Sequence, residues 1–78
     1  MSQTAADQVI DARGMEPPEP FVATMDALAS MDPSHKLLLI LNREPFPLYR
    51  ALHNQGFAYK TEITADGRIE ILIWCKHP

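Results

Sequence analysis

Two clusters that combine prolines with charged residues are the places where this chain of 78 residues could bind a ligand. One spans residues 11–20 and the other residues 43–47, and each joins a predicted strand to a predicted helix. Backbone N–H groups and positive helix ends gather at such junctions, so an arginine in each cluster could complete an anion site, which the neighbouring glutamates would oppose. The candidate binding residues are Asp11, Arg13, Gly14, Glu16, Pro17, Pro18, Glu19, Pro20, Arg43, Glu44, Pro45 and Pro47.

Two interpretations of these junctions stay open. The prolines and charge pairs could be rigid connections that serve only the fold, or they could form a site for a small ligand or a protein partner. Asp11 could form a local bond to the backbone or pair with an arginine. We predict a ligand or partner site, because ligands of α/β folds usually bind at the carboxyl edge of the sheet.

Residue types suited to covalent or metal chemistry are sparse. Cys75 is the only cysteine, which excludes an internal disulfide and a zinc site built from cysteines. It continues an alternation of isoleucines on the core face of a predicted strand, so we expect it to pack as a small hydrophobic side chain. His35, His53 and His77 match no metal-binding spacing. The sequence therefore predicts no catalytic residue, no metal and no cofactor, and it favours a protein that is not an enzyme.

A third candidate surface is the sheet face that no helix would cover. Leu72 and Trp74 would form an exposed apolar spot there, beside Lys60. Tryptophan is enriched in interfaces, so this spot could bind a partner or a second copy of the chain; alternatively, Trp74 packs against one end of the chain. The residues predicted to share this face are Ala58, Lys60, Glu62, Glu70, Leu72, Trp74 and Lys76.

Charge and hydropathy exclude several classes of partner. The net charge of −3 does not support binding to nucleic acid. The longest apolar run, residues 37–41, is far shorter than a membrane span, and residues 1–7 lack the features of a signal peptide. We therefore expect a cytoplasmic protein with a protein partner, and neither nucleic acid nor a membrane.

Four predicted strands must position these residues. A short strand covers residues 8–12, and the apolar run at residues 36–42 suits a central strand, although periodicity does not exclude a buried helix there. The chain ends in a hairpin of two alternating strands. A three-residue loop at residues 65–67 keeps the two apolar faces aligned and pairs Ile63 with Ile69.

Two predicted helices follow the proline clusters. Pro20 and Pro47 are placed at the first helical position, where the missing N–H has no intrahelical partner to lose. Gly56 offers the left-handed residue that ends the second helix. Spacing indicates the inner face of the first helix, which would hold Phe21, Met25 and Leu28, flanked by Val22 and Ala29.

The element order is β-α-β-α-β-β. Right-handed crossovers place both helices on one face of a mixed four-stranded sheet, which predicts an α/β (α+β) two-layer sandwich. We expect a single domain at residues 8–76, with a flexible N-terminal tail at residues 1–7 and a C-terminal tail at residues 77–78.

The first proline cluster resembles the signature of TusA/SirA-like sulfur-carrier proteins. In that family a strand ends in aspartate, and a glycine, an apolar residue and a Cys-Pro-x-Pro motif follow before a helix. The positions that fit this spacing are Asp11, Gly14, Met15, Pro18 and Pro20. Pro17 stands where the family has its persulfide-carrying cysteine.

This resemblance implies a TusA-like fold in an uncharacterised branch, a domain of unknown function without the carrier cysteine, in which residues 43–48 form a second motif. Proline has neither the thiol nor an N–H, so carrier activity at Pro17 is not expected. The expected function is a small non-catalytic domain that binds a protein partner or small ligand at its proline junctions. The alternative is a protein related to sulfur carriers or sulfurtransferases, acting in sulfur transfer or redox metabolism.

Overall fold

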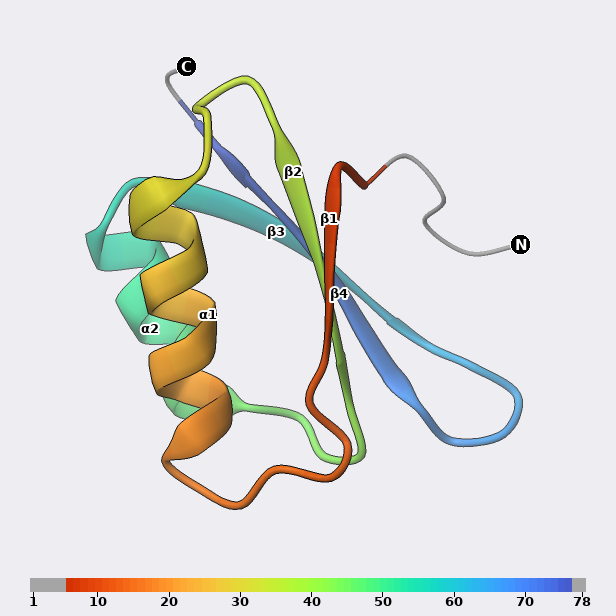
Figure 1. The fold of residues 1–78 in the computed structure, drawn as a ribbon. Helices are drawn as coiled ribbons and strands as arrows, with labels where there is room; N and C mark the ends of the chain where they lie inside the picture. Colours follow the sequence, from red (N-terminus) through yellow and green to blue (C-terminus); the bar gives the residue numbers. More distant parts are fainter. Residues whose placement is uncertain (1–5, 77–78) are drawn as a thin grey trace.

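The computed structural model describes residues 6–76 as a layer of two helices packed on a sheet (Figure 1). The elements are β1 (Gln8–Asp11), α1 (Glu19–Ser30), β2 (Lys36–Leu41), α2 (Phe46–Asn54), β3 (Phe57–Ile63) and β4 (Ile69–Cys75). Both helices lie on the same side of the sheet, which confirms the predicted fold class. Residues 1–5 and 77–78 of the predicted tails lie outside the described residues.

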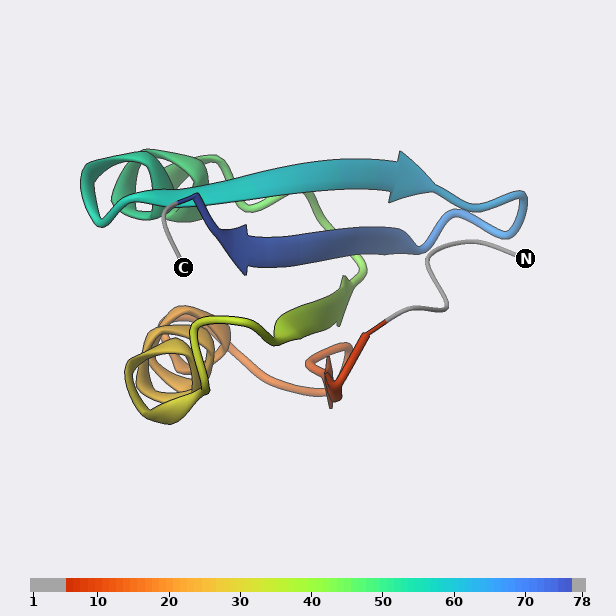
Figure 2. The same cartoon turned by 90° about the horizontal axis from the view of Figure 1, so that it is seen from above.

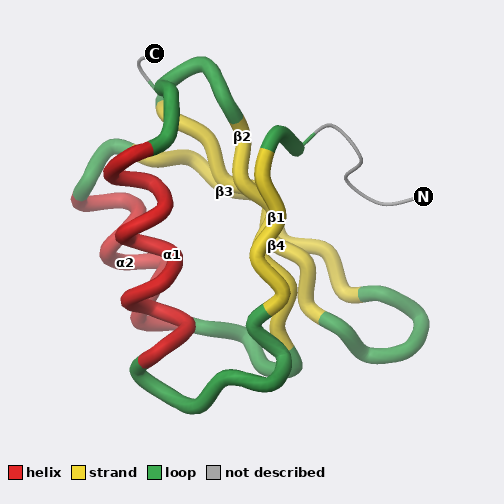
Figure 3. The backbone as a smooth tube through the Cα atoms, viewed as in Figure 1, coloured by secondary structure: helices red, strands yellow, loops and turns green. Residues whose placement is uncertain are grey.

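The sheet is mixed, with the strand order β1-β2-β4-β3. β1 runs parallel to β2, while β4 runs antiparallel to both β2 and β3. The apolar run is therefore the central strand β2, and the alternative of a buried helix is excluded. Figure 3 shows the loop of the β3–β4 hairpin on the side of the molecule away from the helices.

The hydrophobic core lies between the helices and the sheet. Central strands β2 and β4 supply most of it, because alternate side chains of each point toward the helices. The buried residues of this core are Ala12, Leu28, Leu37, Leu39, Leu41, Leu48, Leu52, Ile69, Ile71 and Ile73. Burial of each large apolar side chain contributes about 1.5–3 kcal/mol, so these two strands hold the layers together.

Both helices begin one residue earlier than predicted, at Glu19 and Phe46. Pro18 and Pro45 are the N-cap residues, and Pro20 and Pro47 occupy the second helical position. The shift costs no hydrogen bond, because the first four N–H groups of a helix have no intrahelical acceptor. Gly56 ends α2 as predicted, with a φ of +83°.

The buried face of α1 differs from the prediction. Phe21 and Val22 are exposed, at 39% and 49%, whereas Thr24 and Leu28 are buried. Met25 is only partly buried against the core. The helix is rotated relative to the predicted face, because a polar threonine occupies the centre of the side that meets the sheet and apolar spacing alone could not identify it.

The hairpin has the predicted register. Ile63 pairs with Ile69, and the N–H of Thr64 donates to the carbonyl of Arg68 at 2.9 Å, which leaves a loop of three residues. Gly67 in this loop has a φ of +89°, a conformation that L side chains rarely adopt. Matching the parity of the two strands was therefore sufficient to predict this loop.

The open face, which is the sheet face without helices, is less exposed than predicted. Leu72 is only 9% exposed, because it lies on the central strand β4 between Leu38 and Lys60 on the neighbouring strands. Trp74 is half-buried, and the ammonium of Lys36 lies 5.7 Å from the centre of its ring. The prediction of an exposed Leu72 was wrong, whereas the side chain of Lys60 is 65% exposed.

Glu70 was also predicted to be exposed on this face and is 6% exposed instead. Its carboxylate lies 3.8 Å from the guanidinium of Arg68, two residues earlier. A central strand buries side chains on both faces, because the strands on either side of it hold neighbours against them.

Candidate functional site

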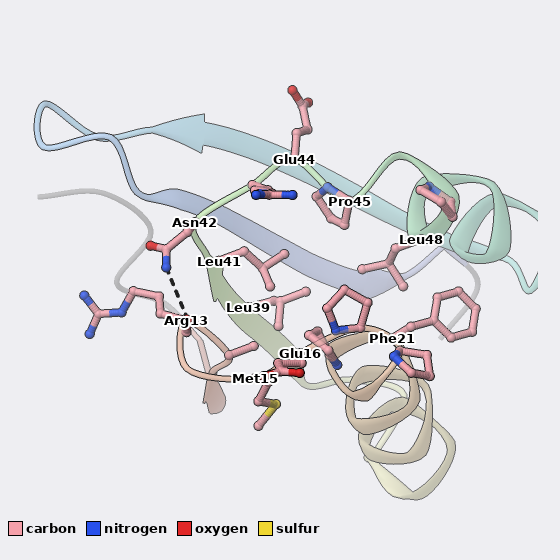
Figure 4. A pocket seen from close by; sticks show the side chains of 16 residues that line it. Arg13, Met15, Glu16, Phe21, Leu39, Leu41, Asn42, Glu44, Pro45 and Leu48 are labelled. Carbon is pink, nitrogen blue, oxygen red and sulfur yellow. Dashed lines mark hydrogen bonds between the residues drawn. The ribbon is translucent and has the colours of Figure 1, made fainter.

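Both proline junctions meet at one edge of the sheet, where they enclose a cavity of about 520 Å³ (Figure 4). β1 and β2 are parallel, so their carboxyl ends lie side by side and the chain leaves each toward a helix. We call this space the junction cavity. Nine of the predicted residues line it: Arg13, Glu16, Pro17, Pro18, Pro20, Arg43, Glu44, Pro45 and Pro47.

Three predicted residues belong to the same junction without lining the cavity: Asp11, Gly14 and Glu19. Asp11 ends β1, and Glu19 begins α1. The peptide bond between Pro17 and Pro18 is cis. Because Asp11 and Glu19 do not line the cavity, the first cluster contributes to it mainly through the residues between β1 and α1.

The walls contain residues that sequence analysis missed. Leu39, Leu41 and Leu48 belong both to the core and to the lining, so the floor of the cavity is the core itself. Met15 and Phe21 add apolar surface from the first junction and α1. The apolar run at residues 36–42 predicted a buried strand that includes Leu39 and Leu41, but nothing in the sequence indicated that these core leucines would also line a cavity.

Arg13 is paired with Asp11, one of the two roles that the sequence left open for Asp11. Its guanidinium bonds to both carboxylate oxygens of Asp11, at 2.8 Å and 2.7 Å, and its N–H also donates to Asp11 at 3.2 Å. The bond to the Arg13 side chain lowers the pKa of Asp11 to about 2. In Figure 4 the Arg13 side chain points away from the cavity. Its charge is thus neutralised beside the site, and both proposed roles of Asp11 are present together.

Asn42 connects the two junctions. Its side-chain N–H donates to the backbone carbonyl of Arg13 at 3.2 Å, across 29 residues of sequence (Figure 4). This bond links the end of β1 to the residue that follows β2. Both residues line the cavity, so the two junctions are joined directly at its lining.

Arg43 is the available cation of the cavity. Among residues 6–76, neither Arg43 nor Glu16 has an ion-pair partner, and both are exposed at the lining. Glu44 is engaged instead, because it accepts a bond of 2.9 Å from the hydroxyl of Tyr49. One free guanidinium and one free carboxylate therefore border the apolar walls.

Tyr49 anchors the second junction to the sheet. Its hydroxyl lies 2.7 Å from the hydroxyl of Thr61, and its ring stacks on Tyr59 with centroids 4.5 Å apart. Burial raises the pKa of Tyr49 to about 12. The phenol stays protonated and holds Glu44 at the end of the loop.

Cys75 lies away from this cavity. It ends β4, opposite Phe57, at the edge of the sheet where β2 begins (Figure 1). The junction cavity is at the other edge, where β2 ends. The one thiol of the chain therefore does not reach the residues that line the cavity.

Residues 6–76 offer neither a cluster of metal ligands nor a membrane span. No group of three or more histidine, cysteine, aspartate or glutamate side chains within that range is placed to hold a metal ion. Neither of the helices in it is long and apolar enough to cross a membrane.

Comparison with known proteins identifies relatives for most of the chain. Residues 9–75 match the family described as "Uncharacterized conserved protein (DUF2249)". No curated protein matches. The crystal structure of a SirA-like protein from Desulfitobacterium hafniense is similar, with a TM-score of 0.76 and 22% identity over 85% of this chain and 93% of that one. The match confirms a TusA/SirA-like fold.

Proposed function

The chain belongs to the DUF2249 family of uncharacterised conserved proteins, and we propose that it acts by non-covalent binding in the junction cavity. The ligand is a small apolar molecule, or an apolar side chain of a partner protein, that carries one anionic group. The observation that carries this proposal is the cavity itself, which brings two separate proline clusters together around the side chains of three core leucines.

The size and walls of the cavity suit such a ligand. Its volume of about 520 Å³ falls within the range of small-molecule sites, about 300–1,000 Å³. Five of its lining residues are prolines, whose rings are apolar and whose backbones are already restricted. A site built from such residues loses little conformational freedom on binding, so more of the contact energy appears as affinity.

The charges at the lining suit a single anionic group. Arg43 is unpaired among the described residues, whereas Arg13 is neutralised by Asp11. Glu16 would repel a second negative charge. A carboxylate held by Arg43, with its apolar body over the leucines, satisfies both conditions.

Calorimetric titration with a panel of small aliphatic and aromatic carboxylic acids tests this proposal. Replacing Arg43 by glutamine is expected to weaken binding of the best acid about tenfold, because one charge-assisted hydrogen bond is lost. Arg50→Gln is the matched control, since Arg50 is an exposed arginine of α2 outside the junction cavity. Equal weakening by both variants, or no saturable binding of any acid, would contradict the proposal.

We further propose that the chain belongs to a branch of TusA/SirA-like proteins that lacks the carrier cysteine. Pro17 lines the cavity at the position where the resemblance expects that cysteine, and Cys75 lies at the opposite edge of the sheet. Both features argue against covalent sulfur transfer. The alternative, a role in sulfur transfer, is supported by the fold, and mass spectrometry after incubation with a cysteine desulfurase and cysteine separates the two. A mass gain of one sulfur on Cys75 would favour the alternative.

A further inference from the structure

Strand β3 presents an unpaired edge. It is the outermost strand beyond β4, as Figure 2 also shows, and it is seven residues long, whereas the other edge strand, β1, has four. The N–H of Thr64 donates to the carbonyl of Arg68, and the carbonyl of Gly56 accepts from the N–H of Lys76. The backbone N–H and C=O groups of even-numbered residues in this strand therefore point toward β4. The backbone groups of Tyr59, Thr61 and Ile63 consequently point outward, where a further strand could pair with them.

Exposed apolar side chains follow the same edge on the helix side. Ile63 and Phe46 are each 67% exposed, and Tyr59 is 39% exposed. Phe46 contacts Tyr49 edge to face at 6.0 Å, and Tyr49 stacks on Tyr59. Half of the large apolar side chains that are exposed among residues 6–76 therefore lie on α2 and β3 along this edge.

The charges of β3 are complementary to those of a second β3. Lys60 and Glu62 share the open face, with 3.9 Å between the ammonium and the carboxylate. In an antiparallel pair centred on Thr61, Lys60 of each copy lies opposite Glu62 of the other, and Tyr59 lies opposite Ile63. Centring the pair on Lys60 or on Glu62 would instead place like charges opposite each other, which is unfavourable.

We propose that two copies of this chain pair through β3, antiparallel about Thr61, into one continuous sheet. The outward N–H and C=O groups of Thr61 bond to those of its counterpart, and those of Tyr59 bond to Ile63. On the helix side, the exposed side chains of Phe46, Tyr59 and Ile63 of one copy meet those of the other. On the open face, each Lys60 lies beside its own Glu62 and opposite Glu62 of the other copy, so the four charges alternate in sign. The strands at the junction cavity are β1 and β2, which lie on the far side of β4 from this interface.

Sedimentation of the full chain from micromolar to millimolar concentration tests the interface. Lys60→Glu and Glu62→Lys are each expected to raise the dimer dissociation constant about tenfold or more, because each places two pairs of like charges across the two-fold axis. The double variant Lys60→Glu/Glu62→Lys restores opposite charges and is expected to dimerise as the native chain does. An equimolar mixture of the two single variants is expected to form a heterodimer. The single changes alter net charge in opposite directions, so a shared weakening does not come from net charge.

Substitutions at Thr61 provide a second test. Thr61→Pro removes the central N–H, which points away from β4, so the fold is retained and the dimer is lost. Thr61→Val is the matched control, because it loses the bond to Tyr49 but keeps that N–H, and it is expected to remain dimeric. A monomer at every concentration would overturn the proposal. So would a dimer that persists in Thr61→Pro with native circular dichroism, or one that Trp74→Ala abolishes.

Discussion

Replacing Thr24 by valine is expected to stabilise the protein. Thr24 is completely buried at the centre of α1, and its hydroxyl has no hydrogen-bond partner among residues 6–76. An unsatisfied hydroxyl in the core loses its hydrogen bonds to water without compensation. Valine has the same shape and replaces this hydroxyl by a methyl group, so the packing of α1 on the sheet is preserved.

The magnitude follows from this burial. Leaving a buried hydroxyl unpaired costs about 1–3 kcal/mol, and the added methyl group gains about 0.8 kcal/mol on full burial. Threonine and valine have similar helix propensities, so the backbone contributes little difference. We expect the free energy of unfolding to rise by about 2–4 kcal/mol, which raises the Tm by about 10–30 °C for a domain of this size.

Urea unfolding of the protein at low protein concentration, followed by circular dichroism, measures this change in the free energy of unfolding. Thr61→Val is the contrasting control, because the Thr61 hydroxyl lies 2.7 Å from that of Tyr49 and its loss is expected to destabilise by about 0.5–1.5 kcal/mol. Thr24→Ser, which keeps the hydroxyl and removes the methyl, is expected to destabilise as well. A Thr24→Val chain no more stable than the native one would refute the reasoning.

Two other expectations concern stability around the junction and the hairpin. The pKa of Asp11 is lowered from 3.8 to about 2 in the folded chain, so its pairing with Arg13 stabilises above pH 3.8, and that stabilisation is lost as the pH falls toward 2. The difference in unfolding free energy between the native chain and Asp11→Asn should therefore shrink over this interval; a constant difference in urea titrations would contradict the assignment. Gly67→Ala is expected to destabilise by about 1 kcal/mol because of the φ of +89°, whereas Gly14→Ala, at a position without a positive φ, should change thermal unfolding much less.

Regular patterns predicted the arrangement of the sheet. Side chains alternate strictly along a strand, so the parity of β3 and β4 determined which loop length pairs Ile63 with Ile69. The apolar run of β2 required cover on both faces, which placed it at the centre. The order of elements then determined that the two proline junctions share one edge.

Predictions failed where tertiary contacts decide exposure. Thr24 is buried because it lies on the side of α1 that packs against the sheet. The spacing of apolar residues does not predict that a polar residue lies on that side. Leu72 and Glu70 are buried by side chains on adjacent strands, and such cover depends on the twist and neighbours of the sheet. The sequence left open whether Asp11 pairs with an arginine, and only the three-dimensional contacts identify Arg13 as that partner.

The central claim is that a ligand binds in the junction cavity, and a titration of ¹⁵N-labelled full chain with a small apolar carboxylate, followed by NMR, tests it most directly. We predict saturable shifts concentrated in residues 12–21 and 39–48, which carry the cavity lining, with the β3–β4 hairpin loop unchanged. Saturable shifts centred on the open face around Trp74, with the two junctions unaffected, would contradict the account.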